Sequence, residues 1–322
     1  KDIYAPGRVN SAGVEFGDAT SLAAFLAQIG KGPAGFPAKA QPLVGGKAMG
    51  GAIRSVTSPV DGRVVGAVEE ADDTVVKSAF DRASSGFAAW SRTPVSSRAE
   101  VLERLADLLE QERGMICALL AREAGKTLDD GVAEVREAVD FCRYYAQEAR
   151  RHFGEGLLMP GPTGEENRLT LRGRGTIVCI SPWNFPLAIF LGQVAAALAA
   201  GNAVIAKPAE QTPLVAAAAV ALAHRAGIPG DALALVPGDG RVGALLVGEP
   251  RVAGVAFTGS TEVAWKINQQ LAAKRGPIVP LIAETGGINA MIVDATALPE
   301  QVSDDVVMSA FRSAGQRCSA LR

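Results

Sequence analysis

The chain has 322 residues, of which 48% are hydrophobic and 20% are charged. That length predicts two lobes with a sizeable core, and the composition is ordinary for a soluble α/β protein. Its 32 basic and 34 acidic residues leave a formal net charge of −2, so we expect no nucleic-acid binding by this segment, while peripheral membrane association cannot be read from it.

Helical signals dominate the first half of the chain. Residues 1–50, rich in glycine, proline and alanine, are expected to form a connecting arm with one short helix near 21–28. Apolar residues then recur at helical spacing from Asp72, again after Pro94, and over about 128–152. Between about 154 and 174, glycine, proline and threonine flank short apolar runs, which predicts a hairpin.

Strand and helix signals alternate in the second half. Strands are expected near 176–180, 203–206, 233–236, 254–258 and 278–283, with helices beginning near positions 187, 213, 242 and 261. This alternation predicts an α/β fold with a doubly wound, Rossmann-like parallel sheet, in which ligands bind beyond the carboxyl ends of the strands. Asn184, Lys207, Gly259 and Glu284 each follow a predicted strand, so we expect them around one crevice.

The four cysteines, at positions 117, 142, 179 and 318, have no short paired spacing, and two histidines complete no zinc pattern. We therefore expect reduced thiols in a cytoplasmic protein and no metal site. The first three fall on apolar faces and are predicted to be core residues. The chain begins with Lys1 and stops four residues after Cys318, which favours a portion of a longer polypeptide.

A lone cysteine usually serves the core, but Cys318 does not stand alone. It follows Glu284-Thr285-Gly286-Gly287 by 34 positions and Pro182-Trp183-Asn184-Phe185-Pro186 by more. The three segments supply a thiol nucleophile, a carboxylate base and an amide donor. An aldehyde carbonyl has no hydride to release until a nucleophile adds to it, and a thiolate meets that need.

These segments, with Lys207-Pro208-Ala209-Glu210 and Phe257-Thr258-Gly259-Ser260-Thr261 between them, resemble the aldehyde dehydrogenase family. The opening stretch, 4–17, is more narrowly similar to the L-glutamate γ-semialdehyde dehydrogenase modules of PutA proline-utilisation proteins. The resemblance implies that Cys318 attacks the aldehyde, that Asn184 and the Cys318 backbone N–H stabilise the oxyanion, and that Glu284 activates water for thioester hydrolysis. It also implies an arm over 1–50, an NAD-binding domain over 51–285 and the start of a truncated catalytic domain over 286–322.

The resemblance implies NAD as the cofactor. Ser260 follows Gly259 where a strand turns into a helix, so it is expected to meet the pyrophosphate. Lys207 and Glu210 match the pair that contacts the adenosine ribose, and a carboxylate there favours NAD over NADP. The run from Gly238 to Gly243 fits a classical dinucleotide fingerprint, and it either lines the adenine side or makes a turn. The remaining cofactor candidates are Ile180, Ser181, Pro182, Trp183, Ala209, Gly240, Thr258 and Gly286.

For the substrate, Ser319 and Glu137 resemble residues of the PutA-like site, and Phe185 would cover the aldehyde path. Glu137 is equally compatible with an exposed helix carboxylate. We expect oxidation of L-glutamate γ-semialdehyde to L-glutamate, the second step of proline catabolism. The alternatives are another semialdehyde, such as succinate semialdehyde, or a catalytically inactive scaffold module. The resemblance also implies a proline dehydrogenase domain with FAD elsewhere in the same polypeptide, and a homo-oligomer in which the hairpin projects into a partner subunit.

Overall fold

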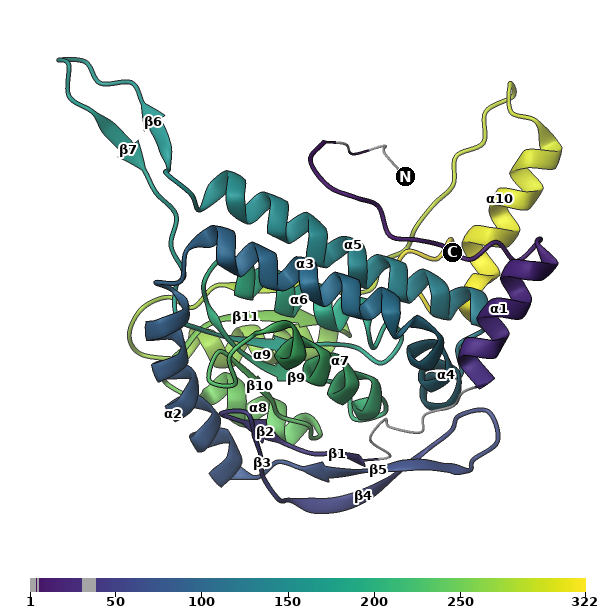
Figure 1. Ribbon diagram of the computed structural model, residues 1–322, viewed down its shortest axis with the longest axis horizontal. Helices are drawn as coiled ribbons and strands as arrows, with labels where there is room; N and C mark the ends of the chain where they lie inside the picture. The colour runs from purple at the N-terminus through teal and green to yellow at the C-terminus, as the bar shows by residue number, and fades with distance from the viewer. Residues whose placement is uncertain (1–3, 5, 31–38) are drawn as a thin grey trace.

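The computed structural model describes residues 4, 6–30 and 39–322, and a seven-stranded sheet lies at its centre (Figure 1). Five strands are parallel and two short edge strands are antiparallel. Their bounds are β2 (Leu43–Val44), β3 (Lys47–Ala48), β8 (Thr176–Ile180), β9 (Ala203–Lys207), β10 (Leu233–Leu235), β11 (Val252–Thr258) and β12 (Leu281–Glu284). The order is β12-β11-β8-β9-β10-β2-β3, which confirms the predicted parallel α/β sheet.

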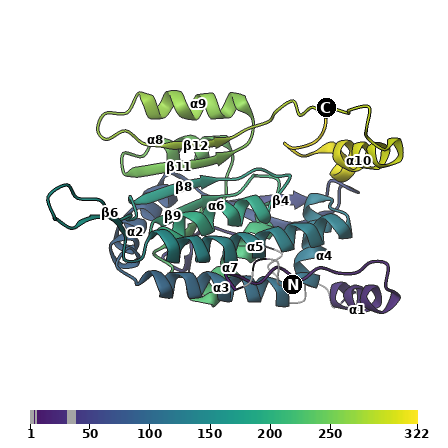
Figure 2. The ribbon, with the colours of Figure 1, turned by 90° about the horizontal axis from the view of Figure 1, so that it is seen from above.

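Helices cover both faces of this sheet because its central strands are apolar on both sides. In β8, Val178 and Ile180 belong to one buried cluster, whereas Cys179 belongs to the other. The helices α6 (Ala188–Ala199) and α7 (Pro213–Ala226) pack in the Cys179 cluster, and α2 (Asp73–Trp90), α8 (Gly240–Gly248) and α9 (Thr261–Ala272) pack in the Val178 cluster. Figure 2 shows α8 and α9 on one side of the sheet and α6 on the other. The sheet is thus doubly wound, as predicted.

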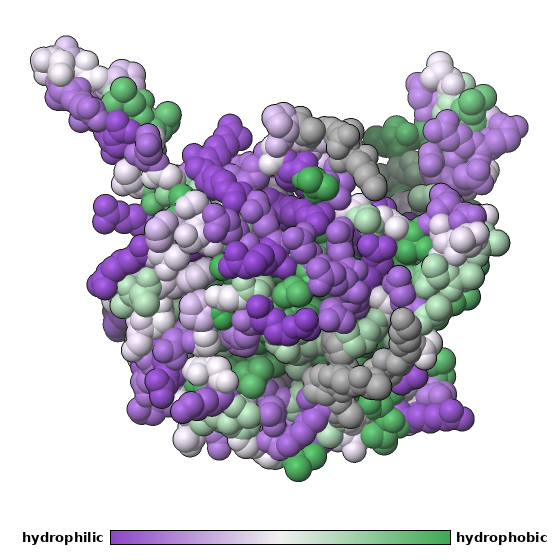
Figure 3. All heavy atoms as spheres, in the orientation of Figure 1, coloured by the Kyte–Doolittle hydropathy of each residue, from purple (hydrophilic) through white to green (hydrophobic). Residues whose placement is uncertain are grey.

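A second helical layer lies outside α6 and α7. It consists of α3 (Val95–Gln111), α4 (Arg113–Ala124) and α5 (Leu128–His152). The predicted apolar stripes of α2 and α3 are largely buried, and Asp72 and Thr127 cap α2 and α5. The outer face of α3 and α5 is mostly hydrophilic (Figure 3), and there Arg150 on α5 donates to both carboxylate oxygens of Glu103 on α3 at 2.5 and 2.8 Å. The sequence prediction did not include α4.

The remaining elements lie at the periphery. They are α1 (Ala19–Gly30), a small sheet of β1 (Lys39–Ala40), β4 (Ala52–Thr57) and β5 (Val64–Glu70), the hairpin β6 (Leu157–Met159) and β7 (Asn167–Leu169), α10 (Pro299–Phe311) and the 3-10 turn η1 (Arg312–Gly315). The predicted short helix and hairpin are confirmed, and the hairpin projects from the body (Figure 1). Parts of the predicted arm lie outside the described residues, but 39–48 form strands of both sheets. Within the described ranges, no helix combines the length and apolarity needed to cross a membrane.

Candidate active site

The carboxyl ends of the parallel strands stop at one level. Ile180 pairs with Lys207 and with Phe257, and Thr258 pairs with Glu284. Loops leaving that edge therefore bring together residues that lie far apart in the sequence, among them Asn184 in the loop between β8 and α6. A cavity of about 1130 Å³ opens at this edge.

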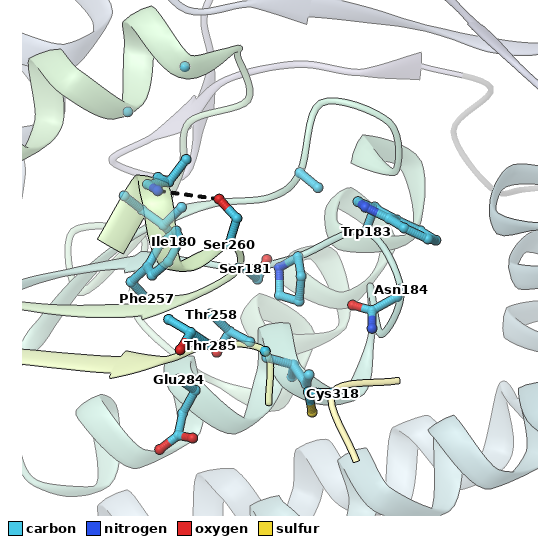
Figure 4. A pocket seen from close by; sticks show the side chains of 18 of the residues that line it. Ile180, Ser181, Trp183, Asn184, Phe257, Thr258, Ser260, Glu284, Thr285 and Cys318 are labelled. Atoms are coloured by element: carbon cyan, nitrogen blue, oxygen red, sulfur yellow. Dashed lines mark hydrogen bonds between the residues drawn. The ribbon is translucent and has the colours of Figure 1, made fainter. Parts of the chain in front are cut away.

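All three proposed catalytic residues and every cofactor candidate line this cavity, and Figure 4 shows the catalytic three with some of the others. Asn184 and Trp183 come from the loop after β8, Thr258 and Glu284 from the ends of β11 and β12, and Cys318 from the loop after η1. The crevice expected from the strand pattern thus exists. The lining set from the prediction is Ile180, Ser181, Pro182, Trp183, Asn184, Lys207, Ala209, Glu210, Gly240, Thr258, Gly259, Ser260, Glu284, Gly286 and Cys318.

Four helices begin at this edge, and three of them have their first amides bound by a carboxylate. Glu134 accepts from α6 and Glu123 from α7, while Asp239 accepts from the Arg241 and Val242 amides of α8 at 2.9 and 3.3 Å. The cap of α9 is the neutral hydroxyl of Ser260, which accepts from the Val263 amide at 3.3 Å. Glu262 in the first turn of α9 is paired with Lys266 at 2.6 Å. Because a helix N-terminus attracts anions and its cap is neutral, α9 is the best placed of the four to hold a phosphate.

This difference also bears on the glycine-rich run from Gly238 to Gly243. Asp239 already occupies the N-terminus of α8, so a phosphate there would meet a like charge. Gly240 nevertheless lines the cavity. The run therefore makes a capped turn beside the cavity, and its place on the adenine side stays a prediction.

Lys207 and Glu210 form the turn after β9. The Lys207 side chain is buried, its Nζ donates to the Pro208 carbonyl at 3.2 Å, and burial lowers its pKa to about 8 against the opposing charges of Glu210, Asp239 and Glu70. Arg54, on β4, donates to the Glu210 backbone carbonyl at 2.6 Å and to Glu70 at 2.7 Å. A strand of the small sheet thus fastens this turn, which the sequence did not suggest.

The loop that carries Cys318 is held from several sides. Ser313 and Ala314 have φ of 55° and 53°, a left-handed conformation that is uncommon outside glycine. Asn184 donates its side-chain amide to the Gln316 carbonyl at 2.8 Å, and Asn289 donates to the Cys318 carbonyl at 2.7 Å. The Cys318 thiol is free and exposed.

A smaller cavity of about 300 Å³ adjoins the first. The three proposed substrate residues, Glu137, Phe185 and Ser319, line it together with Cys318. Glu137 lies on α5 with an exposed side chain, as the alternative reading expected, but the groups packed around its carboxylate exclude enough water to raise its pKa, and Lys126 opposes that rise. The other charged residues that line the smaller cavity are Lys126, Asp130, Arg312 and Arg317. Cys318 therefore lies where the two cavities meet.

The sequence profile named "Aldehyde dehydrogenase family" matches residues 48–322. The chain belongs to the aldehyde dehydrogenase family. It is 48% identical to the bifunctional protein PutA of Klebsiella aerogenes over 327 aligned residues, covering 100% of this chain and 24% of that protein. It is 37% identical to 1-pyrroline-5-carboxylate dehydrogenase of Geobacillus thermodenitrificans, covering 92% of this chain and 59% of that protein. The chain thus spans about a quarter of the length of its PutA relatives.

Solved structures agree with this assignment. Proline utilization A from Bradyrhizobium japonicum shares 58% identity with a TM-score of 0.86, covering 100% of this chain and 29% of that chain. The structure of 1-pyrroline-5-carboxylate dehydrogenase from Thermus with bound NAD shares 33% identity with a TM-score of 0.92, covering 97% of this chain and 62% of that chain.

Several residues that line the two cavities or hold the Cys318 loop were missed by the sequence reasoning. Lys126 lies in the short link between α4 and α5, and Asn289 follows the paired glycines after Glu284. Arg312 donates to Asp129 at 2.5 Å and to Asp130 at 3.4 Å, which ties the Cys318 loop to the start of α5. Nothing local in the sequence signals these contacts.

The other three cysteines are buried, and burial raises the pKa of each thiol to about 12, so they are not nucleophiles.

Proposed function

We propose that the protein oxidises L-glutamate γ-semialdehyde to L-glutamate with NAD, through a covalent intermediate on Cys318. The observation that carries this proposal is the position of the thiol. Cys318 lines both the large cavity, with Asn184 and Glu284, and the small cavity, with Glu137 and Ser319. A nucleophile at that junction can meet an aldehyde from one side and a cofactor from the other.

The residues of the large cavity fit NAD. Its volume of about 1130 Å³ leaves room for a dinucleotide, given that pockets for drug-sized ligands measure about 300–1,000 Å³. Ser260 and the open N-terminus of α9 would hold the pyrophosphate, and Lys207 and Glu210 would hold the adenosine ribose. The Glu210 carboxylate would repel a 2′-phosphate, which favours NAD over NADP. When bound, NAD supplies the hydride acceptor.

The chain's own groups account for the remaining chemistry. The Cys318 thiolate attacks the aldehyde carbon, and the carbonyl oxygen becomes an oxyanion. Asn184 uses one amide hydrogen on the Gln316 carbonyl, so its second hydrogen remains for the oxyanion, beside the Cys318 backbone N–H. Departure of the hydride leaves a thioester on Cys318. Glu284 then takes a proton from water, the resulting hydroxide attacks the thioester carbon, and the carboxylic acid and the thiolate separate.

Charges in the small cavity support an amino-acid substrate. Glu137 offers a carboxylate to an ammonium group, and Ser319 offers a hydroxyl to a carboxylate. Because local desolvation raises the pKa of Glu137, a substrate ammonium nearby would favour the ionised carboxylate. Succinate semialdehyde has no ammonium and would leave that carboxylate unmatched. The names of the relatives, PutA and 1-pyrroline-5-carboxylate dehydrogenase, favour the same substrate.

The surroundings of this segment are also part of the proposal. The PutA relatives are about four times as long as the match, which supports a proline dehydrogenase domain with FAD in the same polypeptide, outside this segment. The projecting hairpin has exposed Leu157 and Leu158, which supports a homo-oligomer that covers them. We further propose the 51–285 and 286–322 division into NAD-binding and catalytic domains, and a cytoplasmic location.

Replacing the nucleophile tests the proposal. In the full-length protein, Cys318→Ala should abolish NAD reduction with glutamate semialdehyde while NAD binding, measured by calorimetry, stays nearly unchanged. Cys179→Ala, which changes a buried cysteine of β8, is the matched control and should keep turnover. Persistent turnover in Cys318→Ala would refute the mechanism, and an inactive full-length protein with intact NAD binding would favour the scaffold alternative.

A further inference from the structure

A buried ion pair lies directly behind the loop that carries Asn184. The Lys126 ammonium is 3.2 Å from a Glu134 carboxylate oxygen, and the two side chains are only 9% and 1% exposed. Desolvation makes such a pair a weak source of net stability, because an apolar pair of similar volume often does as well. The informative question is therefore what the two groups hold in place.

Glu134 fixes the end of the Asn184 loop. Its other carboxylate oxygen accepts from the backbone amides of Leu187 and Ala188, at 3.1 and 3.2 Å. These amides open α6, and Leu187 provides no side-chain cap of its own. The carboxylate from α5 thus substitutes for a local cap three and four residues after Asn184. Burial raises the pKa of Glu134, and Lys126 is the largest influence against that rise, so the cation helps to keep the cap ionised.

Lys126 also holds the residue next to Asn184. Its Nζ lies 4.4 Å from the centroid of the Phe185 ring, within the range of a cation–π interaction. The loop is therefore held at Phe185 by the ammonium and at Leu187 by the carboxylate, and the two charges hold each other. On the far side, the Asn184 amide reaches the Gln316 carbonyl, two residues before Cys318.

We propose that Lys126 and Glu134 are positioning residues that hold the Asn184 amide over the reacting carbonyl, so that removing the Lys126 charge slows thiohemiacetal formation through Asn184. This rests on the oxyanion role given to Asn184 under the proposed function. A misplacement of about 1 Å at a catalytic group costs on the order of a hundredfold in rate. We therefore expect a loss of roughly tenfold to a hundredfold.

A double-mutant cycle in the full-length protein tests this inference. Lys126→Met, Asn184→Ala and the double variant are compared by the rate of the first NADH turnover, at saturating NAD and glutamate semialdehyde. Lys126→Met should lower that rate roughly tenfold to a hundredfold with KM nearly unchanged, and Asn184→Ala should lower it by on the order of a hundredfold or more. The double variant should be no slower than Asn184→Ala alone, because Lys126 acts through that amide.

Two further variants keep a folding defect apart from a positioning defect. Lys126→Arg retains the charge and should restore most of the rate. Glu123→Gln is the matched control for Glu134→Gln: Glu123 is equally buried and caps α7 through the Leu214 and Val215 amides. Glu134→Gln should slow the first turnover, whereas Glu123→Gln should leave its rate unchanged.

Each failure has a separate reading. A multiplicative loss in the double variant, or a change confined to KM, would overturn the positioning role and make Lys126 a substrate contact of the small cavity. Equal losses of the first-turnover rate in Glu134→Gln and Glu123→Gln would show that the Lys126–Glu134 pair only stabilises the fold. An unchanged rate in Asn184→Ala would instead refute the proposed oxyanion role, whatever Lys126 does.

Discussion

Glu123 carries a pH dependence that can be measured locally. It lies on α4, is 2% exposed, and accepts from the Leu214 and Val215 amides at 2.6 and 2.8 Å. Burial outweighs these hydrogen bonds and raises its pKa from 4.5 to about 8. When α7 is packed against α4, the Glu123 carboxyl therefore keeps a proton that it releases above about pH 4.5 once α7 has locally unfolded. Stability supplied by that proton is complete below about pH 4.5 and is lost as pH rises toward 8.

The size of the effect follows from the pH interval. One pH unit inside this window changes the free energy by about 1.4 kcal/mol, so moving from about pH 5.5 to about pH 7.0 should lower the free energy of opening α7 by about 2 kcal/mol. Hydrogen exchange of the α7 amides in the full-length protein, corrected for the intrinsic pH dependence of exchange, reports that free energy. Glu123→Gln is uncharged at both values and should show almost no change.

The control is a carboxylate that touches the same helix from the surface. Glu112 accepts from Arg225, in the last turn of α7, at 3.2 Å with both side chains partly exposed. Glu112→Gln should therefore keep the wild-type pH slope. The reasoning would be refuted by a wild-type opening free energy that stays flat or rises over this interval, or by a Glu123→Gln variant that retains the wild-type slope.

Three further predictions concern the reaction. Glu284→Gln should give a burst of about one NADH per site and then slow turnover, because the thioester accumulates; loss of the burst with NAD still bound would place Glu284 in an earlier step. Ser319→Ala should raise KM for glutamate semialdehyde roughly tenfold or more, since a hydrogen bond to a charged group is worth about 1.5–3 kcal/mol, with propanal oxidation unchanged; equal losses on both would contradict substrate recognition. Because the Lys207 pKa is about 8, the wild-type affinity for NAD should fall as pH rises through 8, when the ammonium loses its charge. The Lys207→Met variant should bind NAD weakly, and its affinity should not depend on pH. A wild-type affinity that stays constant over this range would show that the Lys207 charge does not contribute to NAD binding.

The sheet and the crevice were predictable because their signals are local. Apolar runs bounded by glycine and proline indicated the five parallel strands. Because parallel strands share one direction, the sequence alone predicted that Asn184, Lys207 and Glu284 lie at one edge of the sheet. The helix α5 was predicted with its observed limits from its apolar residues at helical spacing, and the structure adds the cap at Thr127. Cys318 was found through its spacing from Glu284.

Other features had no local signal. The helix α4 is buried on most sides, from Ile116 and Cys117 to Leu120 and Glu123, so it has no polar face to give a period. Strands β2 and β3 have two residues each, too few for any alternation. The caps at Glu123 and Glu134 join residues 91 and 53 positions apart or more. The sequence of an amphipathic helix does not distinguish a carboxylate that faces water from one that caps a distant helix.

The residues that provide these two caps are synthesised before the helices that they cap. The chain emerges from the ribosome N-terminus first, so α4 and α5 exist before α6 and α7 do. When the Leu187 and Leu214 amides appear, Glu134 and Glu123 are already available to bind them. The two helices that support the catalytic edge, α6 and α7, therefore form against helices that were synthesised before them.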